Sequence, residues 1–234
     1  MGLALAAAGA APREVAASGA VVWRVQTSVP DVALTFDDGP SPEYTPQVLA
    51  ELRAAGAVAT FFVLGSQVQR HPDLVRAEAA EHSQVCNHGW RHVIFRGLSA
   101  AEAQASVTRT AALLQSIGVP ACRLFRFPYF ASDATARAAV EGLGFRMVAA
   151  SVDPRDWQRS RAEVIARIVL ADVSPGEIVV LHDGGGSRGA TVGALALILR
   201  GLGERGLRPV TVGALLAEGG CAQPPAPCPP DSAS

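Results

Sequence analysis

The sequence predicts an α/β fold, a (β/α) barrel of about seven parallel strands, and three observations support this prediction. Seven short apolar runs alternate with helical patterns between residues 32 and 217. The runs are almost continuously apolar, which is typical of parallel strands whose faces are both covered. Seven strand–helix units in fewer than 200 residues favour a barrel over an open sheet.

Each predicted strand is rich in Val, Leu, Ile or Phe and stops near a polar residue, Gly or Pro. In chain order the strands cover 32–38, 59–65, 83–89, 123–128, 145–153, 177–183 and 207–212. Helical patterns between them predict helices over 46–55, 72–82, 99–117, 132–142, 160–172 and 190–204. The helix over 99–117 has the clearest ends, because Ser99 and Glu102 match a capping box and Gly118 precedes Pro120.

The composition limits the possible function classes. The 234 residues are 49% hydrophobic and 18% charged, which is enough apolar material for one large core. Twenty basic and twenty-one acidic residues give a formal charge of -1, which argues against nucleic-acid binding. Every basic residue is Arg, so mechanisms that need a Lys are excluded. No apolar run approaches the roughly 20 residues that span a bilayer. As a separate expectation, the protein is a monomer.

The chain divides into three predicted segments. We expect a leader and N-terminal extension over 1–30, a catalytic domain over 31–217 and a Pro-rich tail over 218–234. The apolar run 1–11 resembles a secretory signal with small residues at a cleavage site, although no basic residue precedes it. This predicts a secreted or periplasmic protein.

Four cysteines suit an oxidising compartment, with four unpaired thiols as the alternative. Cys221 and Cys228 lie in the tail, where a local loop is the simplest pairing. Cys86 either packs, pairs with Cys122 or joins the metal site described below.

Ionisable residues gather at the ends of five predicted strands. In α/β folds the carboxyl ends of parallel strands meet at one rim, where active sites lie. An ordinary core or a solvated surface gives no reason for this pattern. The groups are Asp37-Asp38, His88 to His92, Arg126 to Tyr129, Asp153 to Trp157 and His182-Asp183.

His88 and His92 are spaced four residues apart, which on a helical turn places their Cβ atoms about 6 Å apart on one face. Both imidazoles could then reach one ion at Zn–N distances of about 2.0–2.1 Å. The adjacent Asp37 and Asp38 offer a carboxylate ligand and a carboxylate base. The alternative is that the two aspartates only cap the turn that follows them.

The chain contains, in this order, the motifs TFDDGP, H-x-x-x-H, R-x-P-Y, D-x-x-D-W and L-H-D. In order and spacing they closely resemble the five motifs of polysaccharide deacetylases, the NodB-homology domains of carbohydrate esterase family four. The resemblance runs from about residue 32 to residue 216. It implies a distorted (β/α) barrel. It also implies a divalent metal, usually zinc, used to remove N-acetyl or O-acetyl groups from polysaccharides.

The resemblance implies that Asp38, His88 and His92 hold the metal. Asp37 matches the general base, and Arg126 matches the arginine that keeps this base in place. Zinc lowers the pKa of bound water to about 7, so a weak carboxylate base suffices. An arginine beside the base is expected to keep it ionised.

His182 matches the general acid and Asp156 its carboxylate partner, which would raise the pKa of the histidine and keep it protonated. The alternative for His182 is a satisfied core histidine. Tyr129 would donate a backbone N–H to the developing oxyanion. The substrate pocket is expected to include Trp157, Leu181, Phe127 and Trp90, with packing beneath the site as the alternative for Trp90.

Three departures from the family pattern concern the substrate rather than the reaction. Phe127 stands where a second proline is common, and Phe130 stands where a glycine is common. Ala150 and Ser151 occupy a stretch where an aromatic residue often precedes the fourth motif.

These observations predict a zinc-dependent deacetylase that acts on GlcNAc residues of an extracellular polymer such as chitin or peptidoglycan. One alternative is an enzyme of the same fold acting on a small non-sugar amide or on O-acetylated xylan. Another is a catalytically silent carbohydrate-binding domain. The silent alternative predicts that metal ligands or proton carriers are missing, and here the full set is present.

Overall fold

The seven predicted strands all form, and they lie in one parallel sheet. The computed structural model describes residues 20–221. In this part of the chain the strand order is β1-β7-β6-β5-β4-β3-β8, and β9 pairs with β3. The strands are β1 (Val21–Val22), β3 (Asp31–Asp37), β4 (Thr60–Val63), β5 (Gln84–Asn87), β6 (Leu124–Phe125), β7 (Arg146–Val148), β8 (Ile178–His182) and β9 (Arg208–Val210).

The sheet curls back toward itself, as the predicted barrel requires. The N–H groups of Ser151 and Val152, just after β7, donate to the carbonyl of Ile178 in β8 at 2.9 and 3.1 Å. Val180 N–H donates in turn to the carbonyl of Val152 at 3.0 Å. These bonds join segments from opposite ends of the strand order. The prediction of a distorted α/β barrel is therefore confirmed, in the form of a curled half-barrel.

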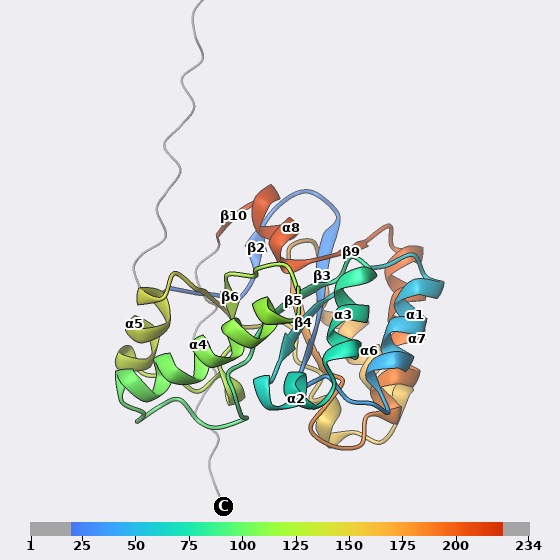
Figure 1. Ribbon diagram of the computed structural model, residues 1–234. Coiled ribbons are helices and arrows are strands. Elements are labelled where there is room, and N and C mark those ends of the chain that lie inside the picture. Colours follow the sequence, from blue (N-terminus) through green and yellow to red (C-terminus); the bar gives the residue numbers. More distant parts are fainter. Residues whose placement is uncertain (1–19, 222–234) are drawn as a thin grey trace, which may run out of the picture.

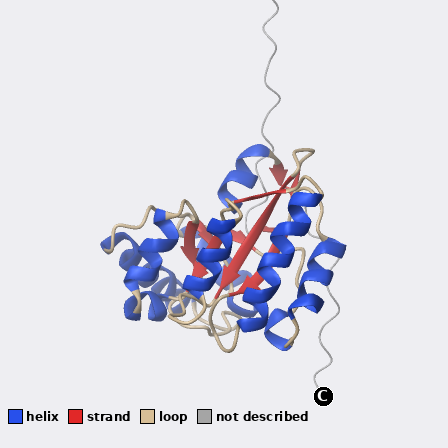
Figure 2. Cartoon of the chain, turned by 90° about the vertical axis from the view of Figure 1, so that its right-hand side faces the viewer, coloured by secondary structure: helices blue, strands red, loops and turns tan. Residues whose placement is uncertain are grey.

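Helices cover the outside of the curled sheet (Figure 1), and Figure 2 shows them flanking the strands in the turned view. All six predicted helices form. Two more, α2 and α8, are too short to show a periodic pattern in the sequence. The helices are α1 (Thr45–Ala54), α2 (Gly65–Arg70), α3 (Pro72–Ala80), α4 (Ala100–Ser116), α5 (Ala134–Gly142), α6 (Ala162–Asp172), α7 (Gly189–Glu204) and α8 (Val212–Glu218).

Strand alternation divides the core between the two faces of the sheet. Leu34 and Phe36 of β3 belong to the apolar cluster that includes residues of α6 and α7. Ala33, the residue before Leu34, belongs to a second cluster on the other face. Because side chains alternate along a strand, Asp37 shares the face of Ala33. The last residue of β3 therefore points away from the helix-covered core.

The segment before residue 31 also takes part in the fold. β1 pairs with β7, and β2 (Val25–Gln26) pairs antiparallel with β10 (Gly220–Cys221). The suggested signal segment 1–11 and Cys228 lie outside the described residues. Within residues 20–221, no helix combines the length and apolar character needed to cross a membrane.

Candidate active site

Asp38, His88 and His92 come together at the carboxyl ends of β3 and β5. One possible ligand atom from each lies within 4.8 Å of the others. Oδ1 of Asp38 lies 3.6 Å from Nε2 of His88 and 3.3 Å from Nε2 of His92. This oxygen is buried and has no hydrogen-bond partner among the described residues. A buried, unpartnered carboxylate oxygen that faces two imidazole nitrogens fits a divalent cation.

The neighbouring strand orients His88. Its Nδ1 lies 2.8 Å from the carbonyl oxygen of Arg126. Because a carbonyl can only accept, Nδ1 donates this hydrogen bond, and Nε2 is the nitrogen that faces Asp38. This second hydrogen bond is typical of a metal-ligating histidine. Burial lowers the pKa of His92, although Asp38 opposes this effect, so the neutral ligating form is favoured.

The two histidines are not on a helical turn, and that expectation was wrong. His88 follows β5, the chain turns at Gly89 with φ +85°, and His92 lies in a bend. The loop nevertheless brings the ring centroids within 5.5 Å of each other. A left-handed glycine allows this reversal at little cost, whereas most other residues would be strained there.

Asp38 is closely surrounded by the glycine turn after β8 and by the buried Asp183. Asp38 itself has φ +73°, a left-handed conformation that is costly for a non-glycine residue. A Cβ added at Gly185 would lie 2.6 Å from Oδ2 of Asp38, so only glycine fits there. Asp183 is fully buried and accepts a hydrogen bond from the Thr45 hydroxyl. Burial raises the pKa of Asp183 to about 7, with the Asp38 charge adding to the effect.

Asp37 is held by a fully buried arginine. Nη1 of Arg126 donates to Oδ1 of Asp37 at 2.8 Å and to the Thr35 hydroxyl at 2.6 Å. Its Nη2 donates to the carbonyl of Ala149 at 2.8 Å, and its guanidinium lies 4.2 Å from the ring centre of Phe62. The predicted pairing of Asp37 with Arg126 is present.

His182, which is partly exposed, pairs with the buried Asp156. Nδ1 of His182 donates to Oδ1 of Asp156 at 2.7 Å, and the backbone N–H of His182 donates to Oδ2 at 2.9 Å. The Thr191 hydroxyl also donates to Oδ2, at 2.7 Å. Burial alone would lower the pKa of His182, but the hydrogen bond and charge of Asp156 outweigh it. With the charges of Asp37 and Asp38, they raise this pKa to about 9.

The four predicted pocket residues are not brought together. Trp157 is 52% exposed on the segment that carries Asp156. Leu181 is fully buried in the cluster next to the helices, because it alternates with His182 along β8. Phe127 packs against Phe95 and Phe125 in a third apolar cluster. These two buried side chains are therefore not on the exposed surface of the site.

Trp90 is half-buried and packs against α2 and α4. The Arg109 guanidinium of α4 lies 3.5 Å from its ring centre, and the indole contacts the backbone of Gly65 at the start of α2. These contacts agree with the alternative of packing, and the pocket role of Trp90 stays a prediction. Tyr129 is 63% exposed, and its ring centre lies 4.2 Å from that of His92.

Sequence reasoning missed two threonines at the site. Thr35 lies two residues before Asp37 on the same face of β3, so strand alternation could have identified it. Thr191 lies on α7, and no signal in the sequence connects it with Asp156. Cys86 forms a disulfide with Cys122, so it is not available as a fourth metal ligand.

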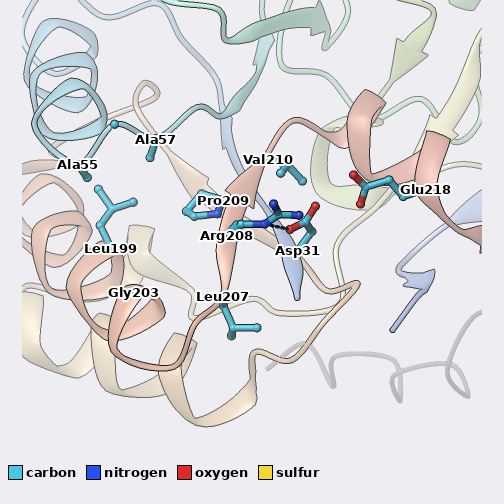
Figure 3. Close-up of a pocket in the computed structure, with 11 residues that line it drawn as sticks. Asp31, Ala55, Ala57, Leu199, Gly203, Leu207, Arg208, Pro209, Val210 and Glu218 are labelled. Carbon is cyan, nitrogen blue, oxygen red and sulfur yellow. Dashed lines mark hydrogen bonds and ion pairs between the residues drawn. The ribbon is translucent and has the colours of Figure 1, made fainter. Parts of the chain in front are cut away.

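A hollow of about 510 Å³ lies at the opposite, amino end of the strands (Figure 3). It is lined by residues at the start of β3, after α1, on α7 and along β9, and it contains the ion pair of Asp31 with Arg208. None of the predicted site residues lines it. The groups that can carry out chemistry therefore lie at the carboxyl rim.

Comparison with known proteins points to one family. The sequence model of the polysaccharide deacetylase family matches residues 24–148. A peptidoglycan-N-acetylglucosamine deacetylase of Bacillus cereus is 40% identical over 207 residues, which cover 87% of this chain and 96% of the relative. A chitooligosaccharide deacetylase of Sinorhizobium fredii is 36% identical over 198 residues, which cover 79% of this chain and 91% of that protein.

A solved structure agrees with the sequence matches. The crystal structure of the peptidoglycan N-acetylglucosamine deacetylase Bc1960 has a TM-score of 0.82 to this chain. The two are 29% identical, and the match covers 87% of this chain and 95% of the other. Sequence, fold and the five ordered motifs thus agree, and this chain belongs to the polysaccharide deacetylases of carbohydrate esterase family four.

Proposed function

We propose that this enzyme removes N-acetyl groups from GlcNAc residues of an extracellular polysaccharide of the chitin or peptidoglycan type, with zinc as its metal. One observation carries the proposal: a three-ligand cluster lies beside a carboxylate held by a buried arginine and near a histidine paired with a buried aspartate. Asp37 and His182 are register partners on the adjacent parallel strands β3 and β8. Asp38, next to Asp37, belongs to the cluster. The names of the relatives support the substrate class.

Asp38, His88 and His92 would hold the metal. Two imidazoles and one carboxylate suit zinc and leave positions open for water and substrate. When bound, the metal polarises the acetyl carbonyl and lowers the pKa of water to about 7.

Asp37 accepts the proton of the attacking water in this proposal. Arg126 fixes Oδ1 of this carboxylate, while Oδ2 faces Nε2 of His88 at 3.9 Å. A base held on one side by a buried guanidinium keeps its free oxygen directed at the ligand cluster. This orientation avoids a reorganisation cost during the reaction.

His182 donates the proton that lets the sugar amine leave. Because Nδ1 is bonded to Asp156, Nε2 is the nitrogen available to the substrate. The pKa of about 9 keeps this imidazole protonated at neutral pH, as a general acid requires. A protonated acid is essential because an unprotonated amine is a poor leaving group.

The backbone N–H of Tyr129 is proposed to stabilise the oxyanion. Tyr129 has φ +57°, and its ring lies tilted against that of His92, one of the proposed ligands. A strained backbone next to reacting groups is a common device for aiming an N–H. The exposed rings of Tyr129 and Trp157 offer apolar faces to the sugar chain.

We also propose a secreted or periplasmic location. The disulfide between Cys86 and Cys122 supports this, because such bonds persist in oxidising compartments. Fractionation of cells into cytoplasm, periplasm and medium, with immunodetection of the protein in each fraction, tests the location directly.

The function is tested by acetate release from N-acetylated chitooligosaccharides, peptidoglycan and acetylxylan. A chelator should abolish release and added zinc should restore it. Asp37→Asn should lower kcat by about 100-fold or more while zinc still binds, since the metal ligands are untouched. Asp31→Asn, at the other end of β3, is the matched control and should retain activity.

Three outcomes would contradict parts of the proposal. Full activity of Asp37→Asn would refute the assignment of the base. Acetate release that does not depend on zinc would refute the proposed role of the metal. Hydrolysis of small amides, without release from any saccharide, would favour the amidase alternative.

A further inference from the structure

The Cys86–Cys122 disulfide joins β5 to the segment just before β6, and His88 and Arg126 directly follow these two strands. We propose that this bond is a positioning crosslink for the active site, which keeps β5 and β6 in the register that these two residues need. The inference rests on the proposed function, since it concerns the same metal and base.

His88 and Arg126 occupy equivalent places on neighbouring strands. Each is the first residue after its strand, β5 or β6. Arg126 N–H donates to the carbonyl of Asn87 at 3.1 Å, and Nδ1 of His88 donates to the carbonyl of Arg126 at 2.8 Å. The direction of Nε2 in His88 and the direction of the guanidinium toward Asp37 therefore depend on the same strand pairing.

The pairing between β5 and β6 is short. Their register consists of one residue pair, Asn87 with Phe125. By contrast, β4 and β5 share four register pairs, and β3 and β8 share five. A slip of one residue would move each side chain to the other face of the sheet. A single ladder pair is a weak barrier to such a slip.

The disulfide reinforces this weak ladder on its amino side. Cys86 lies two residues before His88, and Cys122 lies four residues before Arg126. Cys86 is fully buried among apolar side chains, so its backbone is fixed in the sheet. The crosslink therefore limits relative sliding of the two strands close to the groups that they position.

Cys122 offers a route by which the crosslink can be opened. It is half-buried and lines an open hollow of about 340 Å³ together with His82 and Thr211. A small reductant can thus approach its sulfur. A phosphine reduces the disulfide to two thiols. One water molecule supplies the oxygen of the phosphine oxide and the two protons of the thiols.

Two roles for the bond predict different results. A bond that only stabilises the fold would lower the unfolding temperature and leave the zinc affinity of the folded protein unchanged. A positioning crosslink would also weaken zinc binding, because the ligand His88 and its orienting carbonyl would move relative to Asp38. Loss of support around a metal ligand typically costs about 10- to 100-fold in affinity.

The test compares zinc binding in three metal-free proteins at a temperature where circular dichroism shows each to be folded. They are the wild type, Cys86→Ala/Cys122→Ala and Cys221→Ala/Cys228→Ala. The double substitution avoids leaving a thiol beside His88. It should weaken zinc binding by about 10-fold or more, and the tail variant should bind as the wild type does. Wild-type affinity in folded Cys86→Ala/Cys122→Ala would overturn the inference.

A second measurement does not need that variant to fold and does not depend on the enzymatic function. Amide exchange is followed in wild-type protein before and after reduction with a phosphine under native conditions. Exchange of the Arg126 amide should accelerate relative to amides of β3. Unchanged relative exchange would overturn the inference. Failure of the oxidised wild type to release acetate would instead count against the proposed function.

Discussion

Strand β3 begins and ends with a buried aspartate, and each aspartate is paired with an arginine. At the amino end, Nε of Arg208 lies 2.7 Å from Oδ1 of Asp31 (Figure 3). At the carboxyl end, Nη1 of Arg126 lies 2.8 Å from Oδ1 of Asp37. The two pairs differ in their surroundings. The side chain of Arg208 is 64% exposed, whereas that of Arg126 is fully buried.

The surroundings decide what each pair can do. At the amino end, water screens the arginine, and the nearby hollow has no histidine among its lining residues. At the carboxyl end, the pair lies beside Asp38, a further buried carboxylate with an unpartnered oxygen, and beside two histidines. One arginine cannot balance two carboxylates in a dry site. The excess negative charge there favours a cation. At the amino end Oδ2 of Asp31 is also buried without a hydrogen-bond partner among the described residues, but the arginine there is open to water and no histidine lines the hollow.

The largest expected difference is in stability when each arginine is removed. Arg126→Met leaves Asp37 buried without its cation and should lower the free energy of unfolding by about 3–5 kcal/mol. Arg208→Met should have a much smaller effect, because water from the hollow can reach Asp31 in its place. Urea denaturation followed by circular dichroism measures both. Equal losses in the two variants would show that burial does not distinguish the pairs.

The second prediction concerns the proton on His182. In metal-free protein the titration of His182 should have a midpoint near the pKa of about 9. Asp156→Asn should lower this pKa, because the negative charge that offsets the effect of burial is then lost. Since the folded pKa is raised, this pair stabilises the fold fully below about pH 6.5 and loses that effect as pH rises through about 9. Nuclear magnetic resonance titration of the histidine tests this.

The same substitution should lower kcat by about 10- to 100-fold, because the proposed acid loses its proton at working pH. Arg208→Met is the control and should leave the His182 titration unchanged. A midpoint in Asp156→Asn equal to that of the wild type would remove Asp156 from its proposed role.

The smallest predicted effect concerns a buried carboxyl that lacks an arginine. Glu78 of α3 is fully buried, and neither carboxyl oxygen has a hydrogen-bond partner within residues 20–221. Burial raises its pKa well above the usual value, and the Asp183 charge adds to this. Glu78→Met should therefore increase the free energy of unfolding by about 1–3 kcal/mol at pH 7.

The pH dependence of Glu78 has a definite sign. Its folded pKa is raised, so the wild type loses stability as pH rises above the unfolded value of about 4.5. Glu78→Met should remove the part of this stability loss that comes from ionisation of Glu78. Denaturation of both proteins between pH 4 and pH 8 tests the difference, and a less stable variant would contradict the interpretation of Glu78 as an unpaired buried acid.

Much of the fold could be predicted because its signals are local. All seven apolar runs became parallel strands, and Ser99 with Glu102 forms the predicted capping box. Short elements escaped prediction, since α2 and β1 contain too few residues to show a period. The helical turn predicted for His88 and His92 was wrong because i,i+4 spacing also fits a loop that reverses at a left-handed glycine.

The candidate pocket was less predictable than the candidate ligands. Asp38, His88 and His92 follow strand ends, and parallel strands bring such ends to one rim. Whether Leu181 or Phe127 faces that rim depends on strand alternation and on the neighbouring cluster. Both side chains are buried in apolar clusters instead. Sequence proximity to a functional residue therefore did not indicate proximity to the exposed site.

The sequence by itself determined the strand–helix alternation, the family and the chemical types of the residues gathered at the rim. Only the tertiary structure decided which groups meet: Thr191 with Asp156, Cys86 with Cys122, and Arg126 with both Asp37 and His88. The physical reason is the distance along the chain over which each effect acts. Propensity and periodicity act over a few residues, whereas these contacts depend on how distant strands curl into register.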